Sequence, residues 1–157
     1  MKIKFLSVGK DNENYLNNGI QEYTKRIGRY FNVEWKLICL QKNLSASDEI
    51  ILKQKEAEAI FQLLNKNDYV VALDERGKMY SSLQLASAIQ ARANDAVKQM
   101  VFIIGGAYGL GEEVLQRANF TWSLSPLTFP HQLVRLILAE QVYRACTIMR
   151  NEKYHHA

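Results

Sequence analysis

The sequence is poor in the residues that mark several classes of protein. Its 157 residues include only two cysteines, two prolines and eight glycines. So few cysteines exclude a small scaffold held together by disulfides. The low proline and glycine content excludes a collagen-like or linker-rich chain. Charged residues make up 23% and hydrophobic residues 48%, a balance too apolar for an intrinsically disordered protein.

Long apolar runs are also missing. The first one is interrupted by Lys4 and closed by Gly9, which is too short for a signal peptide, and no run is long enough to span a membrane. Cys39 and Cys146 lie in apolar patterns and are expected to be buried free thiols, which fits a reducing cytoplasm. No histidine stands at a zinc-like spacing from either cysteine, so no metal site is predicted.

What is present fits one globular domain over residues 1–157, long enough to bury a core. The 20 lysines and arginines exceed the 16 aspartates and glutamates, and the formal net charge is +4. Such a surplus permits an anionic partner but does not establish one, because many proteins with this charge never bind nucleic acid.

Short apolar runs alternate with helical patterns along the chain. Strands are predicted at residues 3–8, 33–40, 69–73, 100–104 and 120–124. Helices are predicted at 15–30, from a cap at Ser45 or Ser47 to Leu64, from the capping box Ser81–Gln84 to Ala93, at 112–118 and at 131–149. A polar turn is expected at 74–78.

This alternation predicts an α/β domain with a mostly parallel sheet flanked by helices. Ligands of such sheets bind beyond the carboxyl ends of the strands. The rule points to three places in this chain, directly after Leu73, Ile104 and Leu124.

The last predicted helix is apolar around most of its circumference. Pro130 suits its first turn, and Thr128 could cap it from just outside. One face of a sheet cannot cover so much apolar surface, so the helix must also pack elsewhere. We favour a second subunit as the source of the additional contact surface. The alternative is that the helix packs entirely inside its own domain.

Three segments invite a functional interpretation, and each has a simpler one. The glycines of 105–111 follow a buried strand and suit either a ligand or a tight turn. They match neither the dinucleotide fingerprint nor a phosphate-binding P-loop. Residues 123–131 are either a connector or a loop whose hydroxyls bind a polar ligand. The tail 150–157 is either a frayed end or a functional segment.

Few lone side chains suggest chemistry by themselves. His131 falls in the first turn of a helix, which disfavours its protonated form and predicts a neutral hydrogen-bonding role. Asp74 and Glu140 are isolated carboxylates, which are more often structural than catalytic. No nucleophile–base set can be assembled.

Taken together, however, the segments closely resemble the large-subunit ribosomal RNA methyltransferase H family, a small branch of the SPOUT methyltransferases. The resemblance covers the whole chain and is carried by ordered segments with matched spacing. They are residues 3–10, the LDERGK stretch of 70–78, the IIGGxxGL stretch of 102–110, the WSLSxLTxPHxLxR stretch of 122–135, EQxYRA at 140–145, and Tyr154–His155.

The resemblance implies an α/β sheet whose C-terminal part forms a deep trefoil knot. It also implies methylation of N3 of a pseudouridine in 23S rRNA on the assembled ribosome, with S-adenosylmethionine as the methyl donor. The working unit would be a cytoplasmic homodimer with the last helix at its interface. Neither a metal nor a membrane is implied.

The resemblance further implies the site residues. Those expected to bind the cofactor are Leu73, Gly105, Gly106, Gly109, Leu124, Ser125, Pro126, Leu127, Thr128 and Phe129. His155 is the candidate base for the N3 proton, Tyr154 could stack on the extracted base, and Arg135 could hold its oxygens or a phosphate. Arg144 and His156 are expected to contact RNA.

One position departs from the family pattern. The family usually ends Tyr-His-Arg or Tyr-His-Lys, whereas this chain ends with His155, His156 and Ala157. If the usual cation grips phosphate, binding here should be weaker and depend on pH.

Two other functions remain open at this stage. One is a SPOUT-like module that binds RNA without catalysis, although such a binder has no need of a cofactor loop. The other is a tRNA-directed SPOUT enzyme, although these usually carry an added RNA-binding domain.

Overall fold

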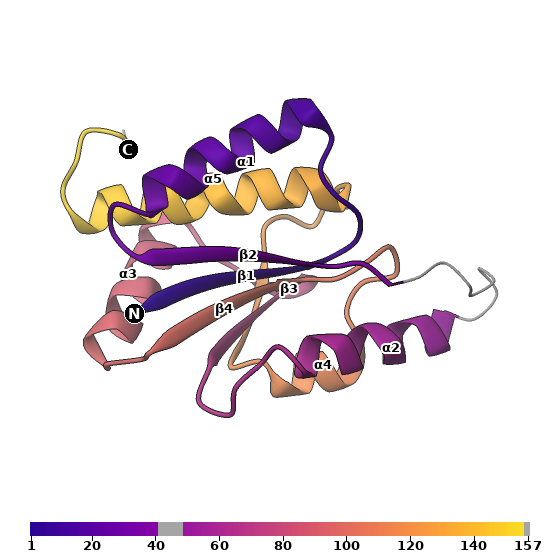
Figure 1. Cartoon of the computed structure of the whole chain (residues 1–157). Coiled ribbons are helices and arrows are strands. Elements are labelled where there is room, and N and C mark those ends of the chain that lie inside the picture. Colours follow the sequence, from indigo (N-terminus) through magenta and orange to yellow (C-terminus); the bar gives the residue numbers. More distant parts are fainter. Residues whose placement is uncertain (41–48, 156–157) are drawn as a thin grey trace.

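The computed structural model describes residues 1–40 and 49–155. A sheet of five parallel strands lies at its centre (Figure 1). The strands are β1 (Lys2–Val8), β2 (Asn32–Ile38), β3 (Tyr69–Met79), β4 (Gln99–Ile104) and β5 (Phe120–Ser123). Their spatial order is β2-β1-β4-β3-β5. The predicted parallel α/β fold is confirmed.

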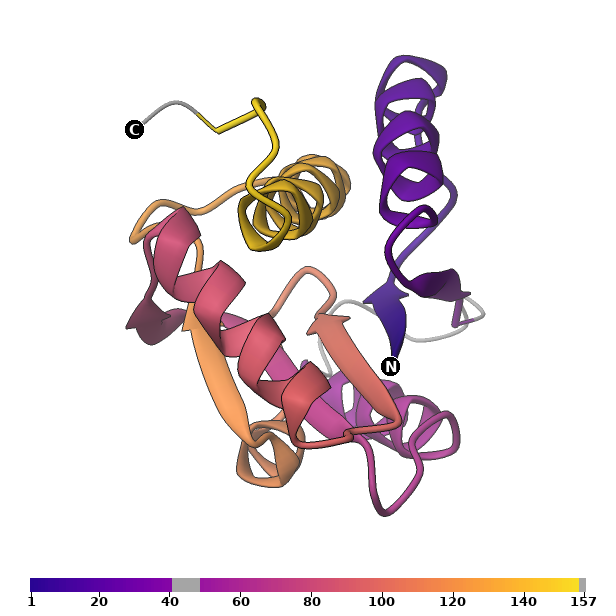
Figure 2. The same cartoon turned by 90° about the vertical axis from the view of Figure 1, so that its left-hand side faces the viewer.

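Helices cover both faces of the sheet (Figures 1 and 2). On one face lie α1 (Asn14–Ile27), α3 (Ser82–Asn94) and α5 (His131–Met149), and on the other lie α2 (Glu49–Phe61) and α4 (Glu112–Arg117). The apolar side chains of β1 and β4 are almost completely buried because both strands have neighbours on either side and helices on either face. Two hydrophobic clusters, one for each face, form the core.

Local signals explain where several helices begin. Ser81 caps α3 in a full capping box, since its hydroxyl accepts the N–H of Gln84 and the Gln84 side chain accepts the N–H of Ser81. The predicted cap of α5 is wrong. Pro130 precedes its first turn without a side-chain cap, and the Thr128 hydroxyl instead donates to Glu75. Ser45 and Ser47 lie outside the described residues.

β3 is longer than predicted, because residues 74–79 continue the strand instead of forming only a polar turn. The pairing of β3 with β5 slips between Leu73 and Lys78, so the segment 74–77 bulges beyond the edge of the sheet. A Cβ at Gly77 would lie only 2.7 Å from the carbonyl oxygen of Thr121. Glycine therefore permits the close approach that restarts the pairing.

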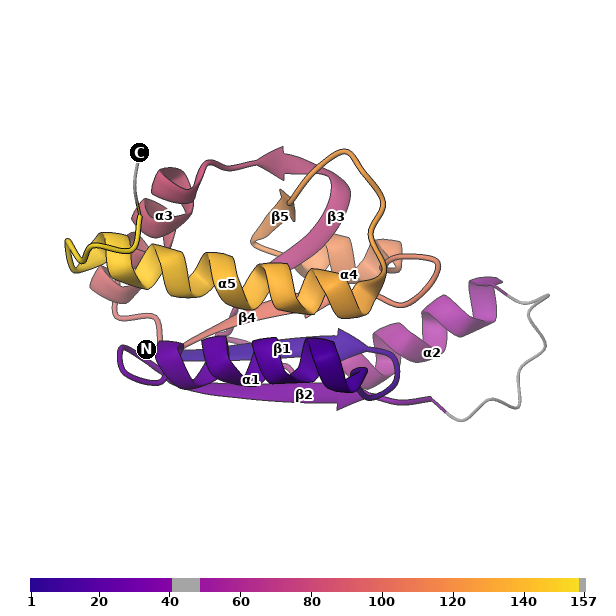
Figure 3. The same ribbon diagram turned by 90° about the horizontal axis from the view of Figure 1, so that it is seen from above.

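α5 lies on the sheet between α1 and α3 (Figure 3). Leu138, Val142 and Ala145 are completely buried in its own chain. One side of the helix is therefore covered by its own domain, whereas Leu133, Leu136 and Ile137 remain partly exposed.

The two cysteines differ. Cys146 is buried as predicted, and burial raises the pKa of its thiol to about 12. The prediction for Cys39 is wrong, because that side chain is exposed and its thiol donates to the carbonyl of Gly9. Cys39 follows the end of an edge strand, where nothing in the described chain covers it.

None of the described helices is long and apolar enough to cross a membrane.

Candidate functional site

A pocket of about 850 Å³ lies where the first part of β3 ends at Leu73 and at the carboxyl ends of β4 and β5. Segments that follow these three points line it, as does the first turn of α5, with His131 and Val134. The volume is within the usual range for a small-molecule site. The three strand ends that the sequence singled out thus meet in one pocket.

Most of the residues predicted to bind the cofactor line this pocket. They are Leu73, Gly105, Gly106, Gly109, Leu124, Ser125, Leu127, Thr128 and Phe129, and only Pro126 does not. The sequence missed Glu49 and Lys53 of α2, since a separate helix gives no local sign that it reaches the site. It also missed Trp122, which the pattern assigned only to a buried strand.

The glycine loop folds back on itself. The N–H of Gly109 donates to the carbonyl of Gly106 over 3.1 Å, and Gly109 has a φ of +76° that favours glycine. A Cβ on Gly105 would lie 2.8 Å from the carbonyl carbon of Gly109. The turn is therefore tight and also lines the pocket, so the two interpretations of this loop do not exclude each other.

Internal hydrogen bonds shape the loop between β5 and α5. The hydroxyl of Ser123 donates to the carbonyl of Ser125, and the Ser125 hydroxyl accepts the N–H of Leu127. Thr128 donates to Glu75, which ties this loop to the bulge of β3 across the pocket. These hydroxyls therefore hold the wall of the pocket in place.

One buried donor in the pocket wall lacks an acceptor. The indole N–H of Trp122 is buried, and none of the described residues accepts a hydrogen bond from it. A buried unpaired donor costs free energy, and this N–H has almost no accessible surface, so a ligand in the pocket does not reach it in this arrangement. Leu73, Ile104 and Leu124 give the pocket apolar walls.

Charged groups at the pocket have shifted pKa values. The guanidinium of Arg76 bonds to Asp74 and keeps the pKa of that carboxyl below its usual value. Burial, and to a lesser extent the charge of Arg135, lowers the pKa of His131. The neutral state predicted for His131 is thus supported, with burial as the main cause.

Arg135 is completely buried beside the pocket. Its guanidinium donates to the hydroxyl of Ser7, to the carbonyls of Val8 and Lys10, and to the side chain of Asn12. These bonds hold the loop between β1 and α1 against α5. The guanidinium of Arg135 thus donates its hydrogen bonds to groups of its own chain, which favours a structural role over contact with a substrate.

The C-terminal tail folds back onto α1 and α5. The hydroxyl of Tyr154 donates to Glu140 over 3.1 Å and lies 3.4 Å from the hydroxyl of Tyr23. The ring of Tyr154 meets Tyr143 edge-on, and the guanidinium of Arg144 lies 4.7 Å from its centre. Burial and these hydrogen bonds raise the pKa of Tyr154. The tail is therefore docked and not frayed at this residue.

Besides Tyr154, Glu140 also binds Arg144. It accepts two hydrogen bonds from Arg144, one turn further along α5. His155 follows Tyr154, and its Nδ1 is buried without a partner among the described residues. His156 lies outside the described residues.

The tail and the pocket belong to opposite ends of α5 (Figure 3). The pocket contacts His131 and Val134, whereas Tyr154 contacts Glu140 and Tyr143. The helix has 19 residues and is therefore about 28 Å long. None of Tyr154, His155, Arg144 and Arg135 lines the pocket. Within one chain the structure does not bring the predicted catalytic and cofactor residues together.

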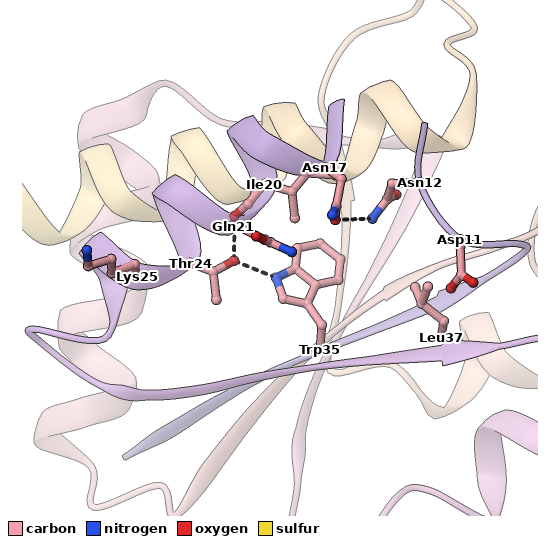
Figure 4. Close-up of a pocket in the computed structure, with 9 residues that line it drawn as sticks. All are labelled: Asp11, Asn12, Asn17, Ile20, Gln21, Thr24, Lys25, Trp35 and Leu37. Atoms are coloured by element: carbon pink, nitrogen blue, oxygen red, sulfur yellow. Dashed lines mark hydrogen bonds between the residues drawn. The ribbon is translucent and has the colours of Figure 1, made fainter. Parts of the chain in front are cut away.

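A second pocket, of about 500 Å³, lies between α1 and β2 (Figure 4). Its floor is the indole of Trp35, whose N–H donates to Thr24 over 2.8 Å, and its rim is formed by amide side chains such as Asn17 and Gln21. No predicted site residue lies in it. Across the described residues, no cluster of histidine, cysteine, aspartate or glutamate is suited to a metal ion.

Known proteins resemble this chain over its whole length. The family model described as "Predicted SPOUT methyltransferase" matches residues 1–155. A ribosomal RNA large subunit methyltransferase H from Alkaliphilus oremlandii is 46% identical over 158 residues, covering 99% of each chain.

Solved structures share the fold at low identity. A candidate RNA methyltransferase from Bacillus anthracis has a TM-score of 0.54 at 15% identity, over 98% of this chain and 99% of its own. A candidate methyltransferase from Legionella pneumophila, solved with bound SAM, has a TM-score of 0.50 at 11% identity, over 92% of this chain and 66% of its own.

Proposed function

The chain belongs to the SPOUT methyltransferase family, and we propose from that membership that it methylates large-subunit ribosomal RNA with S-adenosylmethionine. More specifically, the acceptor is N3 of a pseudouridine in 23S rRNA of the assembled ribosome. This assignment makes residues 1–157 one methyltransferase domain that acts in the cytoplasm. The trefoil knot implied by the family resemblance is part of the same proposal.

The pocket at the ends of β3, β4 and β5 is the observation that carries the proposal. It has a glycine loop that permits close approach, apolar walls and a volume suited to a small molecule. A module that only binds RNA has no use for such a pocket. The near full-length match to a ribosomal RNA methyltransferase favours rRNA over tRNA as the substrate.

Different residues of the pocket contact different parts of the cofactor. S-adenosylmethionine would supply a methyl group on its sulfonium sulfur: an in-line nucleophile attacks the methyl carbon, and the bond to sulfur breaks to leave S-adenosylhomocysteine. Leu73, Leu124 and Leu127 offer apolar surface for its adenine ring, and the backbone of Gly105 and Gly106 offers polar groups without interfering side chains. The bond between Thr128 and Glu75 links two of these walls, which would help to orient the bound cofactor.

The acceptor side of the reaction requires a second subunit. His155 and Tyr154 belong to the other end of α5 from the pocket of their own chain. A homodimer that places the tail of one subunit at the pocket of the other would complete the site. The pocket end of α5 presents half-exposed Leu133, Leu136 and Ile137 beside α1, and these side chains suit such an interface.

The tail residues then act on the RNA. His155 takes the N3 proton after the tail has left α5, because its Nδ1 is buried in the docked tail. Tyr154 supplies an aromatic ring for the extracted base, after release from Glu140. Arg144 contacts the phosphate or the base, and His156 replaces the usual terminal cation. Arg135 supports this site by holding the loop between β1 and α1.

The test is the methylation state of ribosomal RNA. We expect mass spectrometry of 23S rRNA from cells that lack the gene to show the loss of one methyl group on one pseudouridine. The purified protein with S-adenosylmethionine should restore that group on intact ribosomes from those cells.

Several outcomes would contradict the proposal. Methylation of free 23S rRNA but not of ribosomes would remove the assembled ribosome as substrate. An unchanged 23S rRNA together with a missing methyl group on tRNA would favour the tRNA-directed alternative.

A further inference from the structure

Glu56 is a buried carboxylate behind the glycine loop. It lies in the middle of α2, on the face that packs against the sheet, and only 7% of the residue is exposed. Burying a glutamate is costly unless its carboxylate has polar partners. Glu56 does not line the pocket, and neither the sequence patterns nor the proposed chemistry uses it.

The carboxylate of Glu56 lies directly against Gly106. A Cβ on Gly106 would lie 2.5 Å from Oε1 and 3.1 Å from Oε2 of Glu56, so the carboxylate occupies the space that a side chain would need. The backbone N–H of Gly106 is close enough to this carboxylate to lower its pKa, which partly offsets the rise in pKa caused by burial. The contact is thus both steric and polar.

Gly106 is the residue on which the loop closes. Its carbonyl accepts the N–H of Gly109, and the two residues form a small bridge that shapes the turn. On one side of Gly106 is the pocket, and on the other is Glu56. A group that fixes Gly106 from behind therefore fixes the surface that faces a ligand.

The same helix reaches the pocket one turn earlier. Lys53 lines the pocket, forms an ion pair with Glu49 over 3.1 Å, and helps to keep the Glu56 carboxyl ionised through its charge. α2 thus contacts the glycine loop from behind with Glu56 and borders the pocket with Lys53.

From this arrangement we infer that Glu56 is a positioning residue for cofactor binding. Its carboxylate holds Gly106 and so keeps the loop of residues 105–111 in the shape that binds S-adenosylmethionine. The inference rests on the proposed function for the identity of the ligand, but not for the contact between Glu56 and the loop.

The substitution Glu56→Ala tests the inference in the full-length protein. It removes the carboxylate that packs against Gly106 and lies beside its N–H, and so allows the loop to move. We expect the Kd for S-adenosylmethionine, measured by calorimetry, to rise about tenfold. The loss should fall on KM for the cofactor much more than on kcat at saturating cofactor.

Two variants separate positioning from general damage to the fold. Glu56→Gln keeps an oxygen that can accept the N–H of Gly106, and it should restore the Kd to within about threefold of the wild type. Glu58→Ala removes an exposed carboxylate from the same helix and should leave the Kd unchanged. If Glu56→Gln binds as poorly as Glu56→Ala, a hydrogen-bond acceptor does not hold the loop and the inference is wrong.

A measurement without a ligand keeps the two proposals apart. Hydrogen–deuterium exchange of the peptide that contains residues 105–111 should be faster in Glu56→Ala and return to the wild-type rate in Glu56→Gln. This result in a protein that binds no S-adenosylmethionine would overturn the proposed function and leave the role of Glu56 intact. Unchanged exchange and unchanged cofactor affinity in Glu56→Ala would overturn the inference alone.

A double-mutant cycle with Gly106 gives a further test. The methyl group of Gly106→Ala would displace the Glu56 carboxylate, because it would lie 2.5 Å from Oε1. If Glu56 acts through Gly106, then Glu56→Ala should cost much less in the Gly106→Ala background than in the wild type. Fully additive effects on the Kd would contradict the inference.

Discussion

The two ends of α5 carry arginines with opposite surroundings. Arg135 is completely buried and donates only to groups of its own chain, which form the loop between β1 and α1. The side chain of Arg144 is 26% exposed and pairs with Glu140 on the same helix. Nine positions separate the two residues, which is two and a half turns, so they lie on opposite faces of the helix.

The comparison distinguishes residues of one helix that stabilise the fold from residues that can bind another molecule. At the first end, the polar groups bind one another and shape a pocket. At the other end, Tyr154, Arg144 and Glu140 form a cluster at the surface whose bonds can be exchanged for bonds to another molecule. Residue type alone does not distinguish these roles, whereas burial and the identity of the partners do.

The largest expected effect tests whether the pocket of one subunit and the tail of the other form one active site. His155→Ala removes the proposed base, and Gly105→Val distorts the pocket because its side chain would meet the backbone of Gly109. Each variant alone should lose about 100-fold in methylation rate. A mixed dimer with one copy of each, purified through two different tags, has one intact composite site and should retain about half the wild-type activity.

The control for this experiment is a dimer with both substitutions in the same chain and a wild-type partner. It has no complete site if each site uses the pocket of one subunit and the tail of the other, but one complete site if each chain works alone. Activity in this dimer, together with inactivity of the mixed dimer, would contradict the composite site.

A smaller effect distinguishes the two arginines by stability. Arg135→Met should lower the free energy of unfolding by about 3 kcal/mol, because it leaves buried acceptors unpaired. Arg144→Met should lower it by less than about 1 kcal/mol, since the pair with Glu140 is partly exposed. Urea unfolding at one fixed protein concentration measures both values. Equal losses would remove the distinction between the two ends.

The smallest effect is a pH dependence at the first end of α5. Because the folded protein lowers the pKa of His131, the unfolded chain binds a proton there at a higher pH than the folded chain does. Stability is therefore lost as the pH falls below the ordinary value of 6.5, until the folded form is protonated as well. His131→Gln should lose less stability between pH 8 and pH 5 than the wild type, as followed by urea unfolding at each pH.

Strand and helix periodicity predicted most of the fold. The apolar runs of β1, β3 and β4 and the capping box of α3 are local features, and the structure confirms them. The continuation of β3 through residues 74–79 was missed, because Asp74, Glu75 and Arg76 read as a turn. What extends the strand is the close approach of Gly77 to β5, a contact between distant segments that no local pattern contains.

The candidate site was predicted unevenly for the same reason. The rule that ligands bind at strand ends found the pocket, because parallel strands end on the same edge. It could not find Glu56 or Lys53, which reach that edge from α2. It also gave no reason to place Arg135 in the interior, since a buried guanidinium without a carboxylate partner is unusual in any pattern.

The order of strands has a consequence for how the chain folds during synthesis. β4 lies between β1 and β3, so both of these earlier strands present an unpaired edge until residues 99–104 have been made. All pairings are parallel and join segments far apart in the chain, which slows folding. About two thirds of the chain is therefore synthesised before the six residues of β4 are complete, and until then its unpaired strand edges are prone to aggregation.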